Sequence, residues 1–155
     1  MTEQELFQTL TELQALPSKT EWVEFKAART NFSFKEMGEY FSALSNEANL
    51  HDKVSAWLVF GVEDKTHIII GSHYRPARPA LDRLKHEIAQ KTTLSLAFTE
   101  IHELHVQGKR VILFQIPPAP RGIPIAWEGH YYGRDGESLV ALNLHEIESI
   151  RRQVA

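Results

Sequence analysis

Cysteine is absent from this 155-residue chain, and its absence excludes several kinds of site. Without thiols there is no disulfide, no thiolate zinc site and no cysteine nucleophile. Long apolar runs are also missing: the longest reaches only from Ala56 to Val62, far short of the roughly 20 residues of a membrane helix. The first ten residues, MTEQELFQTL, are polar and acidic, unlike a signal peptide. We therefore expect a soluble, cytoplasmic protein with no membrane partner.

An excess of positive charge is missing as well. The chain has 17 basic and 20 acidic residues and a formal net charge of −3, which argues against a protein that coats DNA through bulk charge. A hydrophobic content of 43% and a charged content of 24% are those of a globular protein, so a disordered tail is excluded. The length predicts a single domain over residues 1–155, with an N-terminal helix in 1–17.

Several catalytic motifs do not occur in the sequence. There is no GxxxxGK[ST] loop, no GxGxxG and no GxSxG. His102 and His105, on a strand, point to opposite faces and cannot hold one ion together. The sequence therefore predicts no resident metal and no cofactor.

The apolar spacing predicts an α+β fold: a mixed, mainly antiparallel sheet with hairpins and about four helices. Capping residues or proline mark the helix starts, giving helices over 3–15 after Thr2, over 34–48 after Ser33, from Pro79 to about 91, and after Asn143. Strands are expected at 21–27, 54–62, 67–71 (the return arm of a hairpin), 98–106, 110–116, 124–127, 130–133 and 138–141. The proline-rich segment 117–124 is expected to be an extended loop.

Alternation along 21–27 turns Phe25 toward the core, and Glu24 and Lys26 toward a groove or solvent. Asp64 closes the strand 54–62, so it comes near Glu24 if the two strands are neighbours. Two carboxylates and a lysine are a minimal set for Mg²⁺ or Mn²⁺ at a phosphodiester, which makes Glu24, Asp64 and Lys26 candidate catalytic residues. The alternative is a solvated strand face and a turn.

Basic residues gather in 72–91, where five basic residues face two acidic ones. Arginine beside tyrosine suits phosphate contact and base stacking. The alternative is ordinary solubilising charge. The candidate nucleic-acid contacts in the chain are Arg75, Arg78, Arg83, Lys85, Arg121 and Arg134.

Five motifs occur in a fixed order: VEFKAA (23–28), ALSNEAN (43–49), WLVFGVEDKTHIIIGS (57–72), VILFQIPPAPRGIPIAW (111–127) and YYGRDGESLVAL (131–142). Their order resembles the Schlafen AlbA-type domain over residues 18–152. That domain is described as DNA-binding and occurs in bacterial transcriptional regulators and in divergent relatives of ATP-dependent helicases. The resemblance implies an α+β fold and nucleic-acid binding.

The resemblance also carries a nuclease pattern. Animal Schlafen relatives cleave RNA with a pair of glutamates ahead of an FK dipeptide and with a later aspartate. The second glutamate of the pair corresponds to Glu24, and the aspartate corresponds to Asp64. The first glutamate of the pair corresponds to the position of Lys19 in this sequence, and Glu21 lies two residues away from that position. The N-T-x-G-G stretch that the family carries after its helix is replaced by the longer, glycine-free 45–53. Loss of a carboxylate weakens cation binding.

Three functions are open at this stage. The first is a nucleic-acid-binding domain of a transcriptional-regulator type protein, without enzymatic activity. The second is a metal-dependent nuclease of RNA or single-stranded DNA, using Glu24 and Asp64 with Mg²⁺ or Mn²⁺. The third is a structural or oligomerising domain, and the sequence leaves a homo-oligomer open.

Overall fold

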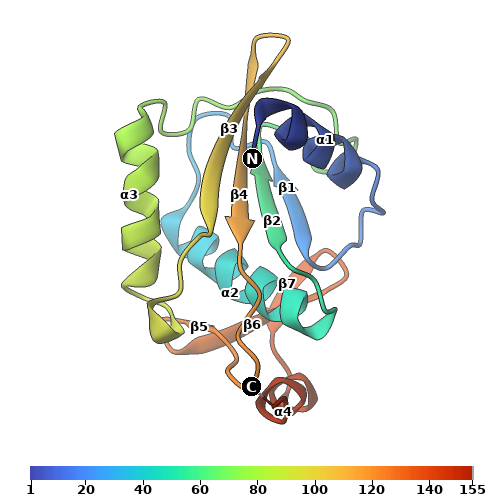
Figure 1. Cartoon of the computed structure of the whole chain (residues 1–155), viewed down its shortest axis with the longest axis vertical. Helices are drawn as coiled ribbons and strands as arrows, with labels where there is room; N and C mark the ends of the chain where they lie inside the picture. The colour runs from blue at the N-terminus through green and yellow to red at the C-terminus, as the bar shows by residue number, and fades with distance from the viewer. Residues whose placement is uncertain (155) are drawn as a thin grey trace.

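A computed structural model describes residues 1–154 of the chain (Figure 1). Its elements, in order, are α1 (Glu3–Gln14), β1 (Val23–Lys26), α2 (Phe34–Leu50), β2 (Ala56–Phe60), α3 (Arg78–Ala89), the 3-10 turn η1 (Thr93–Ser95), β3 (Glu100–Val106), β4 (Lys109–Ile116), β5 (Ala126–Trp127), β6 (His130–Asp135), β7 (Ser138–Ala141) and α4 (Leu144–Arg151). The predicted α+β class is confirmed.

The helix starts lie where the capping residues predict them. The Thr2 hydroxyl accepts the Glu5 N–H at 3.1 Å, and the Glu5 carboxylate accepts the Thr2 N–H at 2.8 Å. Asn143 and Glu146 make the same reciprocal pair ahead of α4. Each pair satisfies two backbone donors that the first helical turn leaves free. Capping chemistry thus fixes where α1 and α4 begin.

The main sheet has the strand order β1-β2-β4-β3, in which β1 and β2 are parallel and the other pairs antiparallel. The parallel pair needs a crossover, and α2 supplies it. Helix α1 lies on one face of this sheet, while α2 and α3 lie on the other (Figure 1). Because both faces are covered, side chains on either side of β1 and β2 are buried.

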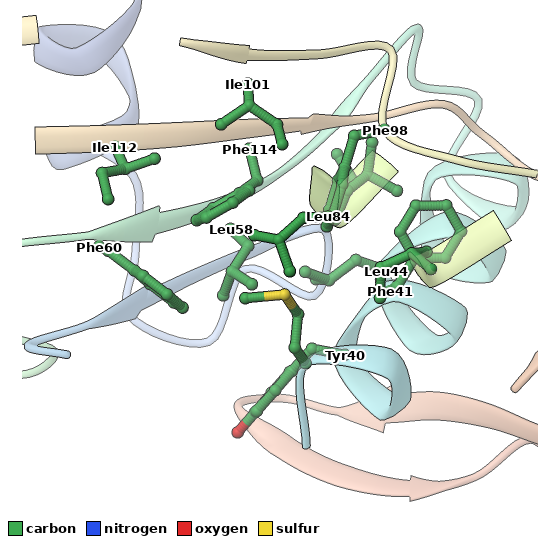
Figure 2. Close-up of a cluster of buried hydrophobic side chains, with 14 of the residues drawn as sticks. Tyr40, Phe41, Leu44, Leu58, Phe60, Leu84, Phe98, Ile101, Ile112 and Phe114 are labelled. Carbon is green, nitrogen blue, oxygen red and sulfur yellow. The ribbon is translucent and has the colours of Figure 1, made fainter. Parts of the chain in front are cut away.

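Alternation along β2 divides the core into two clusters. Trp57 and Val59 pack with the apolar side chains of α1, whereas Leu58 and Phe60 pack with α2 and α3. Figure 2 shows the second cluster, with Tyr40 at its margin and the Tyr40 hydroxyl pointing away from the strands of the main sheet. The period of two is that of a strand buried on both faces.

A second sheet, in the order β5-β6-β7, lies against α2. Polar side chains of α2 bind its backbone: Asn46 donates to the carbonyls of Ile125 and Tyr132, both at 2.9 Å, and Ser42 donates to Ile125 O at 2.7 Å. These side chains are buried and satisfied, so the helix has no solvent-facing polar side there. The small sheet is thereby fixed to α2.

The predicted return strand at 67–71 is wrong. Only an isolated bridge between Val62 and Ile69 forms there. His67 is drawn to α1 instead: Gln14 donates to His67 O at 2.8 Å, and His67 Nδ1 lies 2.9 Å from Gln14 O. The other expected strands appear, most with shorter bounds.

Within residues 1–154 we find no helix with the length and apolar character needed to cross a membrane.

Candidate functional site

Glu24 lies in the middle of β1, opposite Leu58 of β2. Its neighbours Val23 and Phe25 face α1, so Glu24 faces α2 and the small sheet. The residue is only 3% exposed, so the expectation that it faces a groove or solvent is wrong. The physical reason is that β1 is covered on both faces.

Arg134 of β6 is the main partner of Glu24. Its Nη2 lies 2.6 Å from Glu24 Oε1 and also donates to Glu137 O at 3.0 Å. Its guanidinium carbon lies 5.5 Å from the centre of the Tyr40 ring. The Nε and Nη1 atoms of Arg134 are buried without a hydrogen-bond partner among residues 1–154. Arg134 therefore belongs to a buried ion pair and is not presented at the surface.

Lys26 and Asp64 complete the group around Glu24. Lys26 Nζ lies 3.9 Å from Glu24 Oε2 and 5.1 Å from the centre of the Tyr40 ring. Burial raises the pKa of Glu24 to about 7; Arg134 and Lys26 act to lower it, and the nearby Asp64 carboxylate raises it. The structure thus brings the three predicted residues Glu24, Asp64 and Lys26 together.

This group is poorly arranged for a cation. Both Glu24 oxygens already face positive charge, from Arg134 on one side and Lys26 on the other. Lys19 occupies the position of the first nuclease glutamate. Its side chain lies against Gly136 in the β6–β7 turn, with carbon atoms 3.6 Å from the place that a Cβ atom on Gly136 would take. Positive charge at short range opposes a divalent ion.

A second cluster of ionisable side chains, formed by Glu21, Glu47 and His51, lies at the backbone N–H of Arg134. His51 Nε2 is 3.0 Å from Glu21 Oε1 and 3.4 Å from Glu47 Oε1. Burial raises the pKa of Glu47 to about 7; the Arg134 N–H and His51 lower it, and Glu21 and Glu146 raise it. Sequence reasoning missed this group, although Glu47 and His51 are four residues apart and so share one helix face.

The predicted basic residues of 72–91 are largely paired with acids. Arg75 Nη1 lies 2.8 Å from Glu87 Oε1, and Lys85 Nζ lies 2.8 Å from Glu100 Oε1. Arg78 contacts carboxylates on both α3 and β3, at 3.0 Å (Asp82), 3.3 Å (Glu100) and 3.4 Å (Glu103). The local excess of positive charge is therefore offset by acids that β3 brings alongside.

Two of the six predicted contacts are exposed. Arg83 makes no ion pair with any residue of 1–154, and Arg121 donates from Nε to Val154 O at 2.6 Å. Arg134, by contrast, is buried with Glu24. The six residues do not form one continuous surface, although the binding role of each exposed residue stays a prediction.

A basic hollow of about 220 Å³ lies at the turn between β3 and β4. Its lining includes His73, His105, Lys109 and Arg110, and no acidic residue. Arg29 lies alongside, since its carbonyl accepts the His73 N–H at 2.7 Å. Arg110 is held by Glu103 at 2.8 Å, whereas Arg29 and Lys109 are exposed and make no ion pair within residues 1–154.

The fold and this site define an α+β domain in which a buried acid from the edge strand of a mixed sheet pairs with an arginine from a small second sheet. A profile of the family described as Schlafen, AlbA_2 matches residues 19–143. The chain belongs to this family. Comparison with curated proteins gives no match.

Two solved structures share the fold. The DIP2311 protein from Corynebacterium diphtheriae superposes with a TM-score of 0.65 at 21% identity, covering 99% of this chain and 33% of that protein. The N-terminal domain of a protein from Nitrosomonas europaea, described as ATP-dependent DNA helicase RecG-related, superposes with a TM-score of 0.54 at 22% identity. That match covers 89% of this chain and 94% of the domain. This chain thus spans about a third of the DIP2311 protein.

Proposed function

We propose that this chain is a nucleic-acid-binding domain that contacts the phosphate backbone without cleaving it. Membership of the Schlafen AlbA_2 family supports this function, as does the likeness to a domain of a RecG-related protein. The observation that carries it is the basic hollow at the β3–β4 turn, which no acidic residue lines. Paired cations such as Arg75 and Arg78 are less available to phosphate.

The contact surface we propose centres on Arg29 and Lys109. Both are exposed, and both flank the basic hollow. Arg110 fixes the loop beneath them, since its guanidinium donates to backbone carbonyls of Ser72, Tyr74 and Arg75. A rigid loop with free cations at its rim suits phosphate contacts, which position a nucleic acid without reading its sequence.

Salt-dependent binding of labelled duplex and single-stranded oligonucleotides tests the proposal. On duplex DNA each phosphate contact makes the plot of log K against log salt steeper by about 0.9. The double variant Arg29→Glu with Lys109→Glu should therefore make this plot shallower by about 2. Lys35→Glu with Arg151→Glu makes the same charge change at exposed sites elsewhere and should leave the slope unchanged. Equal slopes for both double variants, or no binding by the wild type, would remove the proposal.

Arg83→Glu tests the rest of the predicted patch. Arg83 is an exposed arginine of α3 that makes no ion pair within residues 1–154, so its reversal breaks no ion pair of the fold. Weaker binding with a shallower slope extends the surface onto α3. An unchanged slope confines it to the hairpin end.

A metal-dependent nuclease is the second candidate, because Asp64 does lie beside Glu24 as the sequence suggests. The pairing of Glu24 with Arg134 and Lys26 makes it the weaker one. A role within a transcriptional regulator, a cytoplasmic location and a homo-oligomer all stay predictions.

A further inference from the structure

We propose that Glu21, Glu47 and His51 form a binding site for a divalent transition-metal ion such as Zn²⁺, separate from the Glu24 group and from nucleic-acid contact. One donor atom from each residue lies within 4.8 Å of the others. Glu21 precedes β1, whereas Glu47 lies in the last turn of α2 and His51 is the C-cap of that helix. This proposal departs from the sequence-based prediction of no metal.

The separations between donor atoms fit a zinc ion. Zinc bonds to imidazole nitrogen and carboxylate oxygen are about 2.0–2.2 Å long, so two donors of a tetrahedral ion lie about 3.3 Å apart. His51 Nε2 lies 3.0 Å from the Glu21 oxygen and 3.4 Å from the Glu47 oxygen. One ring nitrogen facing two carboxylate oxygens can satisfy only one of them with a proton, but an ion between them satisfies all three.

Glu47 supplies the independent reason to expect a cation. The residue is 1% exposed, and no lysine or arginine side chain within residues 1–154 pairs with it. Its Oε2 accepts the Arg134 N–H at 3.1 Å, and its Oε1 faces His51 Nε2 at 3.4 Å, so its one charged side-chain partner among residues 1–154 is an imidazole. Buried carboxylates are normally paired or bound to a metal, because an uncompensated charge is strongly unfavourable there.

Groups around the site hold these side chains in place. The Gly136 N–H donates to Glu21 Oε2 at 2.9 Å, as the Arg134 N–H does to Glu47 Oε2. Each backbone donor occupies one oxygen and leaves the other for an ion, while the Trp22 ring, 4.9 Å from that of His51, packs on the imidazole. Such supporting contacts are typical of metal sites in proteins.

The site is open to solvent on the side of His51, whose side chain is exposed. Glu21 also lines a hollow of about 470 Å³ with Arg134, Asn143 and Glu146, which Glu47 and His51 do not line. Three protein ligands with a fourth position open to water is an arrangement that zinc adopts. Mg²⁺ prefers oxygen ligands in an octahedral arrangement, so an imidazole favours zinc over magnesium.

Titration of metal-free protein with Zn²⁺ against a chromophoric chelator tests the proposal. We expect one Zn²⁺ per chain, a higher melting temperature with Zn²⁺, and no such rise with Mg²⁺. Removing a group that only supports a metal ligand typically weakens metal binding about 10–100-fold. His51→Gln and Glu47→Gln each remove a ligand itself, so each should weaken Zn²⁺ binding by more than this. His51 is exposed, so its variant remains informative if Glu47→Gln fails to fold.

His86→Gln is the matched control, because it removes an exposed histidine on α3 whose Nε2 lies 3.1 Å from Gln90 Nε2 and makes no ion pair within residues 1–154. It should bind Zn²⁺ like the wild type. Absence of stoichiometric binding by the wild type would overturn the proposal. So would equal affinity in the wild type and His51→Gln, which would place the ion on other histidines of the surface.

Discussion

Glu24 and Arg134 depend on each other for their burial. Both side chains are almost fully buried, and the 2.6 Å contact joins them. Removing one partner of a buried ion pair typically costs about 3–5 kcal/mol. Lys26, 3.9 Å from the other Glu24 oxygen, remains in place, so the lower end of this range, about 3 kcal/mol, applies here. We expect Arg134→Met to lower the free energy of unfolding by that amount in chemical denaturation.

The double variant Glu24→Leu with Arg134→Met supplies the control for this prediction. It removes both charges together, so it should be much more stable than the two single losses combined imply. Additive losses would show that the two side chains are stabilised independently of each other, against the pairing seen here.

Glu47 makes stability depend on pH. Its pKa is raised from 4.5 to about 7 by burial, so between these values the unfolded chain has released its proton while the folded chain keeps it. Folding then binds a proton, and the free energy of unfolding must fall as pH rises through this window. Below it the carboxyl is protonated in both states and the stabilisation is complete.

Denaturation at pH 4.5 to 7.5, in a chelator that keeps metal away from the Glu47 carboxylate, measures this dependence. Glu47→Gln should show a shallower decline than the wild type. Glu24 contributes in the same direction, because burial raises its pKa as well, so some decline should remain. Identical profiles for wild type and variant would contradict the prediction.

Residue patterns predicted one side of β1 and not the other. Alternation alone indicates that Phe25 is buried, and it is. The burial of Glu24 depends on Arg134, which is 110 residues away in sequence. The group formed by Glu21, Glu47 and His51 is also non-local, because Glu21 is 30 residues from His51 and is held by the Gly136 N–H of the β6–β7 turn. The four-residue spacing places Glu47 and His51 on one helix face, but spacing contains no signal for the contacts that Glu21 and Arg134 make.

Helix α1 precedes the segment 19–143 that the family profile matches, yet it forms part of the core. Leu10 is fully buried against the sheet, whereas Phe7 of the same helix is 50% exposed. We expect Leu10→Ala to destabilise the protein by about 2–5 kcal/mol, as for other buried leucines. Phe7→Ala should cost far less. Equal effects in thermal or chemical denaturation would mean that α1 does not pack on the sheet.

Helix α3 shows why local charge misleads. Its basic residues suggest a phosphate-binding face when 72–91 is considered alone. Strand β3 then places Glu100 and Glu103 beside Arg78 and Lys85. Helix boundaries follow from capping and spacing within one segment, but the net charge of a surface is decided by all the segments that meet there. The first was predictable from sequence and the second was not.

For the whole molecule, we expect nucleic-acid binding without cleavage. Labelled tRNA and single-stranded DNA incubated with purified protein and Mn²⁺ should remain intact, because Arg134 and Lys26 occupy the Glu24 carboxylate. Cleavage that disappears in Glu24→Ala would contradict this expectation. Cleavage that persists in that variant would indicate a contaminating nuclease, which a second purification step would separate from the protein.

The polar side of α2 determines how the small sheet exchanges its amide hydrogens. Two amides at this sheet are held by helix side chains: the N–H of Ile125, just before β5, donates to Asn46 Oδ1 at 2.8 Å, and the N–H of Tyr132 in β6 donates to Ser42 Oγ at 3.1 Å. Both can exchange with deuterium only when the sheet separates from α2. Once each rate is divided by the intrinsic exchange rate of its amide, the two opening free energies should therefore be equal and report one opening event, and Asn46→Ala should lower both.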